Sequence, residues 1–337
     1  MSKTILLGHG SGGKLTGNLI KKTFIRYFSN PVLEALTDSA IINVGDKLLA
    51  FTTDSYVVDP VFFPGGDIGK LAVNGTVNDL AVSGAEPMFI SASFIIEEGL
   101  QISDLEVITK SMRDESDKAG VKIVTGDTKV VKKGQCDKIF INTSGIGILD
   151  KKHENISTGK YIEPGDKIII NGHIGDHAIA VMGARENLKF ETKIESDCAP
   201  LNHLIKAFLN SGSDIKFMRD ITRGGLATIV SEIVENRKFG VSINEAAVPV
   251  RESVKGMCEI FGYDPLFLAN EGKVLIVVSD ISAEKVMEIM KTHEYGKDAA
   301  LIGEITTGNA GKAILRSIVG GSRIIDRLTG EQLPRIC

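Results

Sequence analysis

The chain has 337 residues, of which 43% are hydrophobic, and this size predicts two domains rather than one compact core. A formal net charge of −4 argues against a nucleic-acid-binding protein, which usually carries a basic stripe, and favours a small-molecule or protein partner. Because the first twenty residues show no secretory signal and no apolar run approaches the roughly 18 residues of a membrane span, we expect a cytoplasmic protein.

The opening segment, Gly8 to Lys14, is rich in glycine and precedes a helical pattern over residues 15–28. It resembles a phosphate-binding loop only loosely, because it lacks the Walker spacing and no strand leads tightly into it. A flexible linker is the alternative. The residues predicted to contact a cofactor here are Gly10, Gly12, Gly13 and Lys14.

Two strands are predicted next, over residues 39–43 and 47–53, and a turn at Gly45 and Asp46 joins them. The second strand runs directly into Asp54. A carboxylate at the end of a strand is well placed to line a site, so Asp54 is a candidate site residue.

A helix is predicted over residues 67–83, with Asp67 as its cap. The helix is apolar almost all round, which indicates burial. Asn74 and Asn78 nevertheless lie one turn apart on it, with Asp79 beside them. Burying such groups unpaired would cost roughly 2–7 kcal/mol for each neutral one. They therefore form either an internal hydrogen-bond network or a face that lines a ligand or metal site.

Strands and helices alternate over the following residues. We expect, in order, a strand over 88–96, a helix over 103–119, a strand over 121–124 and a strand over 139–149 that Gly145 and Gly147 interrupt. The strand that ends at residue 124 leads into a polar stretch. The candidate site residues in this stretch are Asp127, Thr128 and Lys129.

A second region that mixes strands and helices starts near residue 163, with a strand over 167–171. This pattern predicts the α/β (α+β) class with two domains. The predicted parts are a glycine-rich N-terminal segment (1–36), an N-terminal domain (37–155), a C-terminal α/β domain (156–320) and a mobile tail (321–337).

Two further acidic residues lie next to predicted elements. Asp220 precedes a helical pattern over 226–234, so it either caps that helix or lies near amides that bind an anion. Glu271 comes shortly before a buried strand over 274–278. Both residues are therefore candidates for a site at the ends of these elements.

The chain ends in Cys337, and Pro334 prevents this tail from ending as a regular helix. From Gly330 the tail can reach roughly 23 Å at about 3.3 Å per residue, which is enough to carry the thiol into a cleft. A frayed, exposed end is the alternative. The cysteines show no CxxC or CxxH spacing, which favours reduced thiols over disulfides or a zinc site. They are Cys136, Cys198, Cys258 and Cys337.

Hard divalent cations such as Mg²⁺ prefer oxygen ligands and usually bridge carboxylates to phosphates. Several aspartates follow or open regular elements beside small residues, and Lys129 and Arg223 accompany them. This combination predicts Mg-nucleotide binding. The aspartates are Asp54, Asp67, Asp79, Asp127 and Asp220.

Five stretches look like motifs of the ATP-binding superfamily of aminoimidazole ribonucleotide synthetase and selenophosphate synthetase: Phe51–Ser55, Gly65–Lys70, Val77–Ala81, Gly126–Lys129 and Arg219–Leu226. Within this superfamily, the opening Gly8–Gly13 and the closing Pro334–Cys337 resemble the HypE family of hydrogenase maturation proteins. The resemblance runs nearly end to end.

The resemblance implies two α/β domains, a homodimer in which the N-terminal sheets of two subunits pair, and ATP held at the domain and subunit junction. It implies that Cys337 receives a carbamoyl group from a HypF-type carbamoyltransferase. ATP would then drive dehydration of the S-carboxamide to an S-cyanide. The cyano group would pass to iron in a HypC–HypD complex during assembly of the [NiFe]-hydrogenase centre.

Dehydration of a carboxamide needs phosphoryl transfer to its oxygen, which depends on positioning and charge neutralisation. We expect Mg²⁺ on Asp54, Asp79 and Asp220, with Asp67 as a further ligand. The ATP-binding residues would also include Asn78, Asp127, Thr128 and Arg223. Lys129 would contact the phosphate or the carbamoyl group.

A base must also remove protons from the amide nitrogen, and the resemblance makes Glu271 the leading candidate, because Asn270-Glu271-Gly272 precedes a buried strand and matches a motif of the family. Its alternative role is a hydrogen bond that closes the turn. The Cys337 thiol, which ordinarily titrates near ~8.5, is expected to have its pKa raised by the adjacent carboxylate and lowered by Arg335.

Two rival interpretations remain. Selenophosphate synthetase uses the same aspartates, but it normally carries a reactive cysteine or selenocysteine in the N-terminal glycine loop, where this chain has Ser11. The other is a non-catalytic, nucleotide-gated scaffold whose tail cysteine forms a mixed disulfide with a partner.

Overall fold

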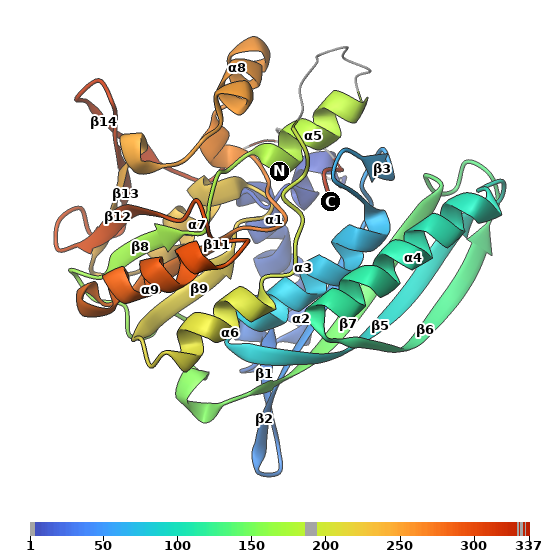
Figure 1. The fold of residues 1–337 in the computed structure, drawn as a ribbon, viewed down its shortest axis with the longest axis horizontal. Helices are drawn as coiled ribbons and strands as arrows, with labels where there is room; N and C mark the ends of the chain where they lie inside the picture. Colours follow the sequence, from blue (N-terminus) through green and yellow to red (C-terminus); the bar gives the residue numbers. More distant parts are fainter. Residues whose placement is uncertain (1–3, 186–193, 329, 331–332, 334) are drawn as a thin grey trace.

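The structure is a computed structural model, and it describes residues 4–185, 194–328, 330, 333 and 335–337. A five-stranded sheet is followed along the chain by a seven-stranded sheet, and helices cover both (Figure 1). The mixture of strands and helices in both halves confirms the predicted α/β (α+β) class. Among the described residues, no helix combines the length and the apolar character that crossing a membrane requires.

The first sheet has the strand order β1-β2-β7-β5-β6. Its neighbours are antiparallel except for β5 and β6, which run parallel and are connected through the helix α4 (Ile102–Ala119). A parallel pair needs such a crossover, whereas the antiparallel β1 and β2 are joined by a tight turn. The strands are β1 (Ala40–Val44), β2 (Lys47–Tyr56), β5 (Ala85–Glu97), β6 (Lys122–Val131) and β7 (Ile139–Leu149).

Two of these strands are longer or more regular than predicted. The strand β6 continues through Asp127 to Val131, because it pairs with β5 along this whole stretch. The strand β7 is not interrupted at Gly145 or Gly147. A Cβ on Gly145 would lie 2.6 Å from the Cγ2 atom of Thr76, so this glycine lets the helix above the sheet pack closely rather than breaking the strand.

That helix is α3 (Ile68–Val82), and it lies in the middle of the molecule (Figure 1). The Asp67 carboxylate accepts hydrogen bonds from the amides of Gly69 (2.7 Å) and Lys70 (3.1 Å), which confirms the predicted cap. One side of α3 packs on the first sheet, and the other side faces the second domain, including the helix α6 (Asn202–Asn210). Burial on both sides explains why the helix is apolar almost all round.

The second sheet has the order β14-β13-β10-β12-β8-β11-β9 and separates two layers of helices. The helices α6 and α9 (Asp280–Thr292) pack on one face, and α7 (Gly225–Ile233) packs on the other. The helices α5 (Asp176–Arg185) and α8 (Glu252–Phe261) share a core cluster with the first domain. The strands are β8 (Lys167–Ile170), β9 (Ile215–Asp220), β10 (Gly240–Asn244), β11 (Val274–Val278), β12 (Ala300–Thr306), β13 (Ala313–Arg316) and β14 (Ser322–Ile325).

Short elements complete the described part of the chain. The helical pattern near the N-terminus is confirmed as α1 (Lys14–Leu19), a π-helical turn (Ile20–Phe24) and α2 (Ile25–Phe28). A small hairpin precedes α3 and consists of β3 (Phe62–Phe63) and β4 (Gly66–Asp67). The 3-10 helices are Leu7–Gly10, Leu33–Ala35, Lys151–His153, Glu245–Ala247 and Pro265–Phe267.

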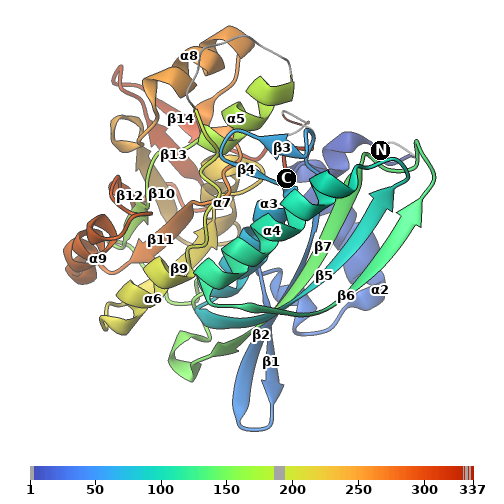
Figure 2. The ribbon, with the colours of Figure 1, turned by 45° about the vertical axis from the view of Figure 1, so that its right-hand side comes forward.

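The start of the predicted tail was placed too early. Strand β14 pairs with β13, so the first residues of the stretch from 321 belong to the second sheet. After β14 the chain turns back toward the first domain, and its C-terminal end lies close to α3 and the β3–β4 hairpin (Figures 1 and 2). Pro334 lies outside the described residues.

Candidate active site

The last residues of the chain are docked against the segment that follows β2. The Val57 amide donates a hydrogen bond to the Cys337 carbonyl (3.0 Å), and the Asp59 amide donates one to the Arg335 carbonyl (3.3 Å). In return, Arg335 Nε donates to the Val57 carbonyl (3.1 Å). Ile336 is only 2% exposed and belongs to the core cluster of the first domain. Cys337 is therefore docked against the first domain and is half-buried in this structure.

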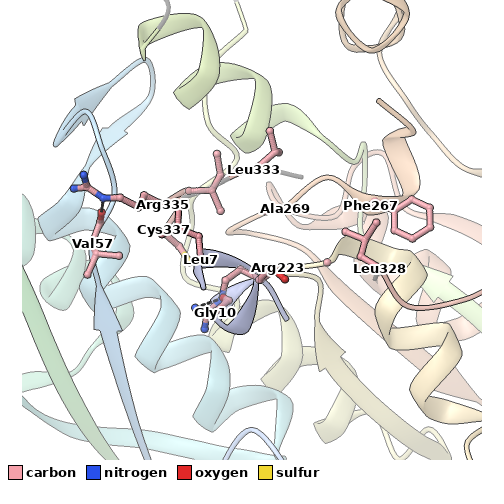
Figure 3. A pocket seen from close by; sticks show the side chains of 13 residues that line it. Leu7, Gly10, Val57, Arg223, Phe267, Ala269, Leu328, Leu333, Arg335 and Cys337 are labelled. Atoms are coloured by element: carbon pink, nitrogen blue, oxygen red, sulfur yellow. Dashed lines mark hydrogen bonds between the residues drawn. The ribbon is translucent and has the colours of Figure 1, made fainter. Parts of the chain in front are cut away.

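Cys337 borders a cavity of about 200 Å³ (Figure 3). Burial raises the pKa of its thiol to about 12, Arg223 lowers it, and Glu271 and Asp54 raise it further. The expectation that Arg335 would be the opposing cation is wrong. The Arg335 guanidinium turns away toward Val57 and forms an ion pair with Asp137. The residues lining the cavity include Leu7, Gly10, Ser11, Val57, Arg223, Ala269, Leu333, Arg335, Ile336 and Cys337.

Four carboxylates from both domains gather near this cavity. Asp79 lies on the last turns of α3, where the Thr52 hydroxyl donates to its Oδ2 atom (2.7 Å). Burial raises the pKa of Asp79 well above its ordinary value, and the charges of Asp220, Asp38 and Asp54 raise it further. The mutual influence shows that these side chains lie close enough to repel one another when they are ionised.

Asp220 is the last residue of β9 and is 8% exposed. Burial raises its pKa to about 8, and the charges of Asp38 and Asp54 add to this effect. The alternative that Asp220 caps the next helix is wrong, because Gly224 occupies the N-cap position of α7. The strand end thus places Asp220 in the carboxylate cluster.

The neighbouring cations neutralise this cluster only in part. Arg219 Nε lies 3.1 Å from Asp38 Oδ1, but the same guanidinium also pairs with Glu232 at 2.6 Å. Buried carboxylates with raised pKa values are typical of places where a hard cation binds. No group of three His, Cys, Asp or Glu side chains in the described part of the chain is already arranged around a common point. Carboxylate oxygens are nevertheless the donor type that Mg²⁺ takes when phosphate oxygens and water complete its shell.

Asp67 does not join the other predicted metal ligands. Its Oδ1 atom caps α3, and its Oδ2 atom accepts a hydrogen bond from the Ser111 hydroxyl (2.5 Å). Burial raises the pKa of Asp67 and these hydrogen bonds oppose the rise. Its contacts are those of a structural cap.

A groove of about 720 Å³ lies next to the tail cavity and is of the size that small-molecule sites have. Asp38, Asp220 and several cationic side chains line it, and Arg223 lines both the groove and the tail cavity. The cations on its wall are Lys21, Arg219, Arg223, Arg237 and Arg327. Carboxylates and cations together suit a nucleotide with its metal ion.

The glycine-rich loop forms part of this wall. Gly12 has φ +79°, and a Cβ there would lie 3.0 Å from the Arg223 carbonyl oxygen. A Cβ on Gly13 would lie 2.5 Å from the Leu328 carbonyl oxygen. Gly10 borders the tail cavity instead, and its carbonyl accepts a long hydrogen bond from Arg223 (3.4 Å). Lys14 forms an exposed ion pair with Asp326 at 2.6 Å.

Asn78 connects the two domains through its amide group. Its nitrogen donates to the carbonyls of Ala199 (3.1 Å) and Glu271 (3.3 Å), and its oxygen accepts from the Leu201 amide (2.8 Å). Asn78 is 2% exposed. These bonds favour the hydrogen-bond network that the sequence left open as the alternative to ligand binding.

Glu271 is almost fully buried, and its Oε1 atom has no hydrogen-bond partner among the described residues. Its backbone amide, rather than its side chain, donates to Asp197 (3.1 Å). Burial raises the pKa of Glu271 well above its ordinary value, as do the charges of Asp220, Asp197 and Asp54, whereas Arg223 lowers it. A carboxylate with a raised pKa is a stronger base.

Asp127, Thr128 and Lys129 are exposed on the edge strand β6. Lys129 Nζ lies 2.7 Å from Asp127 Oδ2. Asp127 and Thr128 line a separate hollow over β5 and β6, with Met112 of α4. Within one chain, the structure therefore does not bring these residues into the buried cluster.

Three residues near the site were not predicted. Asp38 could have been found, because the tripeptide Thr37–Ser39 repeats the Thr-Asp-Ser sequence that surrounds Asp54. Tyr56 is buried, and its pKa is raised by burial and by Asp54 and Asp79. A Cβ on Gly75 would lie 2.1 Å from the Tyr56 hydroxyl, so a glycine in α3 admits the phenol ring. His177 contacts the docked tail, and no sequence signal indicates this.

Comparison with known families matches both domains. The model of the AIR synthase related protein N-terminal domain matches residues 36–149, and that of the C-terminal domain matches residues 163–316. Carbamoyl dehydratase HypE of Rhodobacter capsulatus is 47% identical over 99% of this chain and 98% of the relative. Carbamoyl dehydratase HypE of Escherichia coli K12 is 44% identical and covers 99% of both chains.

Solved structures show the same similarity. A crystal structure of a HypE–HypF complex gives a TM-score of 0.86 at 52% identity and covers 92% of this chain and 99% of that chain. HypE in complex with ATP gives a TM-score of 0.82 at 44% identity and covers 99% and 100%. A ThiL structure with AMPPCP and TMP, at 16% identity and a TM-score of 0.71, shares the fold. This chain belongs to the HypE family of carbamoyl dehydratases, within the AIR synthase related proteins.

Proposed function

We propose that this enzyme dehydrates a carbamoyl group carried on Cys337, using ATP, and so supplies the cyanide ligand for the iron of a [NiFe]-hydrogenase. The observation that carries the proposal is that Arg223 lines both the cavity of the docked Cys337 and the adjacent groove with its carboxylates. A phosphoryl donor in the groove and a carbamoyl group on Cys337 would thus share one wall. The similarity to HypE in complex with ATP supports the identity of the donor.

In the first step, the carbamoyl oxygen attacks the γ-phosphorus of ATP. The new O–P bond forms, the bond to the β-phosphate oxygen breaks, and ADP leaves. The amide nitrogen loses a proton, which leaves a C=N double bond and a phosphorylated oxygen. This step turns a very poor leaving group into phosphate, which is a good one.

In the second step, the nitrogen loses its remaining proton and the C–O bond breaks. The products are the S-cyanide on Cys337, ADP and phosphate, so that the atoms of water leave as phosphate oxygen and two protons. Glu271 is the base in this proposal, because its buried carboxylate has a raised pKa. It also lies close enough to Cys337 for its charge to raise the pKa of the thiol.

Arg223 would orient the phosphoryl group between the groove and the tail. Asp54, Asp79 and Asp220 would hold Mg²⁺, and Asp38 would support them through Arg219. When bound, Mg²⁺ supplies positive charge that offsets the charge of the phosphates during transfer. The raised pKa values of Asp79 and Asp220 support this assignment, since a cation would relieve the repulsion that causes part of each rise.

The proposed assembly is a homodimer formed through the open face of the first sheet. Phe51, Ile146 and Phe89 are cross-strand neighbours on β2, β7 and β5, and each is at least 40% exposed. A row of exposed apolar side chains across a sheet is typical of an interface. Asp127, Thr128 and Lys129 on the edge of this sheet would serve the ATP site of the second copy.

The proposed partners are a HypF-type carbamoyltransferase, which loads Cys337, and a HypC–HypD complex, which accepts the cyanide. The first is supported by the similarity to HypE in the HypE–HypF complex. We also propose a cytoplasmic location, in line with four cysteines that are all free. The proposed domains are 37–155 and 156–325, with the tail starting after β14 rather than at 321.

The proposal is tested with Cys337→Ala and with Cys136→Ala as the matched control. Each protein is incubated with the HypF-type carbamoyltransferase, carbamoyl phosphate and ATP, and its intact mass is measured. We expect Cys136→Ala to gain one carbamoyl group and then lose one water, and Cys337→Ala to do neither while it still binds ATP. Carbamoylation and water loss in Cys337→Ala would overturn the proposal.

A further inference from the structure

The tail is held by its main chain, and a different donor serves each of its last three carbonyls. The Val57 amide binds the Cys337 carbonyl, and Arg185 Nη2 donates to the Arg335 carbonyl (3.0 Å). His177, near the start of α5, lies 2.8 Å through its Nε2 atom from the Ile336 carbonyl. That carbonyl belongs to the peptide bond that leads into Cys337, so holding it fixes the peptide plane from which the Cys337 side chain extends.

The hydrogen-bond pattern fixes the tautomer of His177. A carbonyl oxygen only accepts, so the Nε2 atom must carry the proton that is donated to Ile336. Burial lowers the pKa of His177, which keeps the ring neutral and leaves Nδ1 as an acceptor. Ser196 Oγ lies 2.8 Å from Nδ1 and accepts from the Cys198 amide (3.1 Å), so the hydroxyl proton is free to point at the ring.

The ring is also held in place sterically. His177 is 0% exposed, and Phe63 contacts it edge-on with ring centroids 5.5 Å apart. A ring that is buried, packed against another ring and hydrogen-bonded at both nitrogens has little freedom to turn. Such a donor can position a flexible chain end.

The segment that orients His177 also orients the proposed base. Asp197 follows Ser196, and its Oδ1 atom accepts the amide of Glu271 (3.1 Å). Asp197 is itself paired with Lys273 at 2.9 Å. The Ser196 amide is bound by the Pro64 carbonyl (2.8 Å), which ties this segment to the hairpin before α3. Two consecutive residues therefore serve both parts of the site. Ser196 orients His177, which holds the tail, and Asp197 binds the backbone of Glu271.

We propose that His177 is a positioning residue for the reaction: through its bond to the Ile336 carbonyl it holds the carbamoylated Cys337 in register with Glu271 and the carboxylate cluster. This inference rests on the proposed function of Cys337. It assigns to His177 no contact with the reacting atoms. Loss of the bond lets the chain end rotate, and a displacement of about 1 Å in a reacting group can slow a reaction by about a hundredfold.

The test compares His177→Asn with His177→Gln. The amide of Gln reaches the place of Nε2 and keeps a donor for the Ile336 carbonyl, whereas the shorter Asn reaches only the place of Nδ1. Each protein is first carbamoylated on Cys337 with potassium cyanate and freed of reagent. It is then mixed with saturating ATP and Mg²⁺, and the loss of water is followed by intact mass in a single turnover.

We expect His177→Asn to lose water about ten to a hundred times more slowly than the wild type, with unchanged ATP affinity. His177→Gln should stay within a few-fold of the wild type. A second readout is the alkylation of uncarbamoylated Cys337 by iodoacetamide, which should become faster in His177→Asn because the tail leaves its cavity more often. A purely structural role of His177 would not produce slower dehydration together with faster alkylation.

Two results would overturn the inference. One is wild-type rates of both reactions in His177→Asn, and the other is equal slowing of dehydration in the Asn and Gln variants. The wild-type control separates this inference from the proposed function. If carbamoylated wild-type protein itself loses no water with ATP and Mg²⁺, the proposed function has failed, whatever the two variants do.

Discussion

The inner and the outer residues of the predicted site differ in what surrounds them. The inner carboxylates, Asp54, Asp79 and Asp220, come from both domains, and the charges of Asp38 and Asp54 raise the pKa values of Asp79 and Asp220. The outer pair, Asp127 and Lys129, lies exposed on β6, where each side chain neutralises the other. The charge of the inner aspartates is thus only partly neutralised, whereas Lys129 neutralises the charge of Asp127.

The cause of the difference lies in the elements that carry these residues. Helix α3 is enclosed between the first sheet and the second domain, so Asp79 is only partly exposed to water. Strand β6 is an edge strand and faces solvent along almost its whole length. A buried charge is costly without a compensating partner, and the neighbouring cations neutralise the inner carboxylates only in part. In the outer pair, Lys129 neutralises Asp127. This contrast supports the proposal that the inner carboxylates bind the cation and that the outer pair acts on a second copy of the chain.

The largest effect is expected from Asp220→Asn. Removing this carboxylate should slow single-turnover dehydration by about a hundredfold or more, because the phosphoryl transfer loses preorganised charge stabilisation. The matched variant on the outer pair is Asp127→Asn. Both proteins are carbamoylated and assayed by intact mass with ATP and Mg²⁺.

Mixing the two variants sharpens the comparison. If Asp127 serves the cleft of the second copy, subunit exchange between Asp220→Asn and Asp127→Asn creates dimers with one intact cleft. Activity should then recover to about a quarter of the wild type, because half of the dimers are mixed and half of their clefts are intact. No recovery after demonstrated exchange would show that the outer pair does not act across a dimer.

The stability of the metal-free protein should depend on pH through the inner carboxylates. The folded pKa of Asp220 is raised to about 8, above an ordinary value of about 4. Between these values the folded state binds more protons than the unfolded state, so the free energy of unfolding should fall as pH rises from about 4 to about 8. Thermal melts in EDTA across this range measure the slope.

In these melts, Asp220→Asn should flatten the slope and Asp127→Asn should leave it unchanged. Added Mg²⁺ should stabilise the wild type most at the upper end of the range, where the carboxylates are ionised. A slope of the opposite sign in EDTA would mean that the cluster carries no excess negative charge.

Asn78→Ala should act mainly on stability. It leaves two buried carbonyls and one buried amide without their partner, and a cost of about 3 kcal/mol is expected. Urea denaturation measures this loss, and ATP affinity at a temperature where the variant is folded should be close to that of the wild type. A large loss of ATP affinity without loss of stability would restore the original prediction that Asn78 contacts the cofactor.

The smallest effect is expected from Lys14→Ala. Its ion pair with Asp326 is exposed on both sides and should contribute less than about 1 kcal/mol. ATP affinity, measured by calorimetry, should change by less than about threefold if Lys14 serves only this pair. A larger loss would place Lys14 at the phosphates of the nucleotide.

Local patterns predicted much of the fold and part of the site. The apolar character of α3, the cap at Asp67 and the hairpin of β1 and β2 each follow from a few neighbouring residues, and the structure confirms them. The predicted strand at β6 is too short, because its glycine and polar residues resemble a loop, whereas pairing with β5 extends the strand to Val131. The sequence predicts a break at Gly145, because it does not show the helix that packs on this glycine.

Contacts between distant segments escaped prediction. The charge of Asp38 acts on Asp79 within the first domain and on Asp220 across the two domains, and His177 contacts Ile336 only where the tail docks. Asp67 could be predicted as a cap from its neighbours, but its absence from the carboxylate cluster depends on where α3 starts relative to β9. The sequence thus predicts which kinds of side chain form the site, but not which of these side chains lie next to one another.

The central claim is that ATP removes the oxygen of the carbamoyl group on Cys337. It is tested most directly by carbamoylating the protein with a group that carries oxygen-18 and then adding ATP and Mg²⁺. We predict that the label appears in the released phosphate and that the protein keeps an unlabelled cyano group. Label that remains on the protein or appears in water, while phosphate is released unlabelled, would contradict the account.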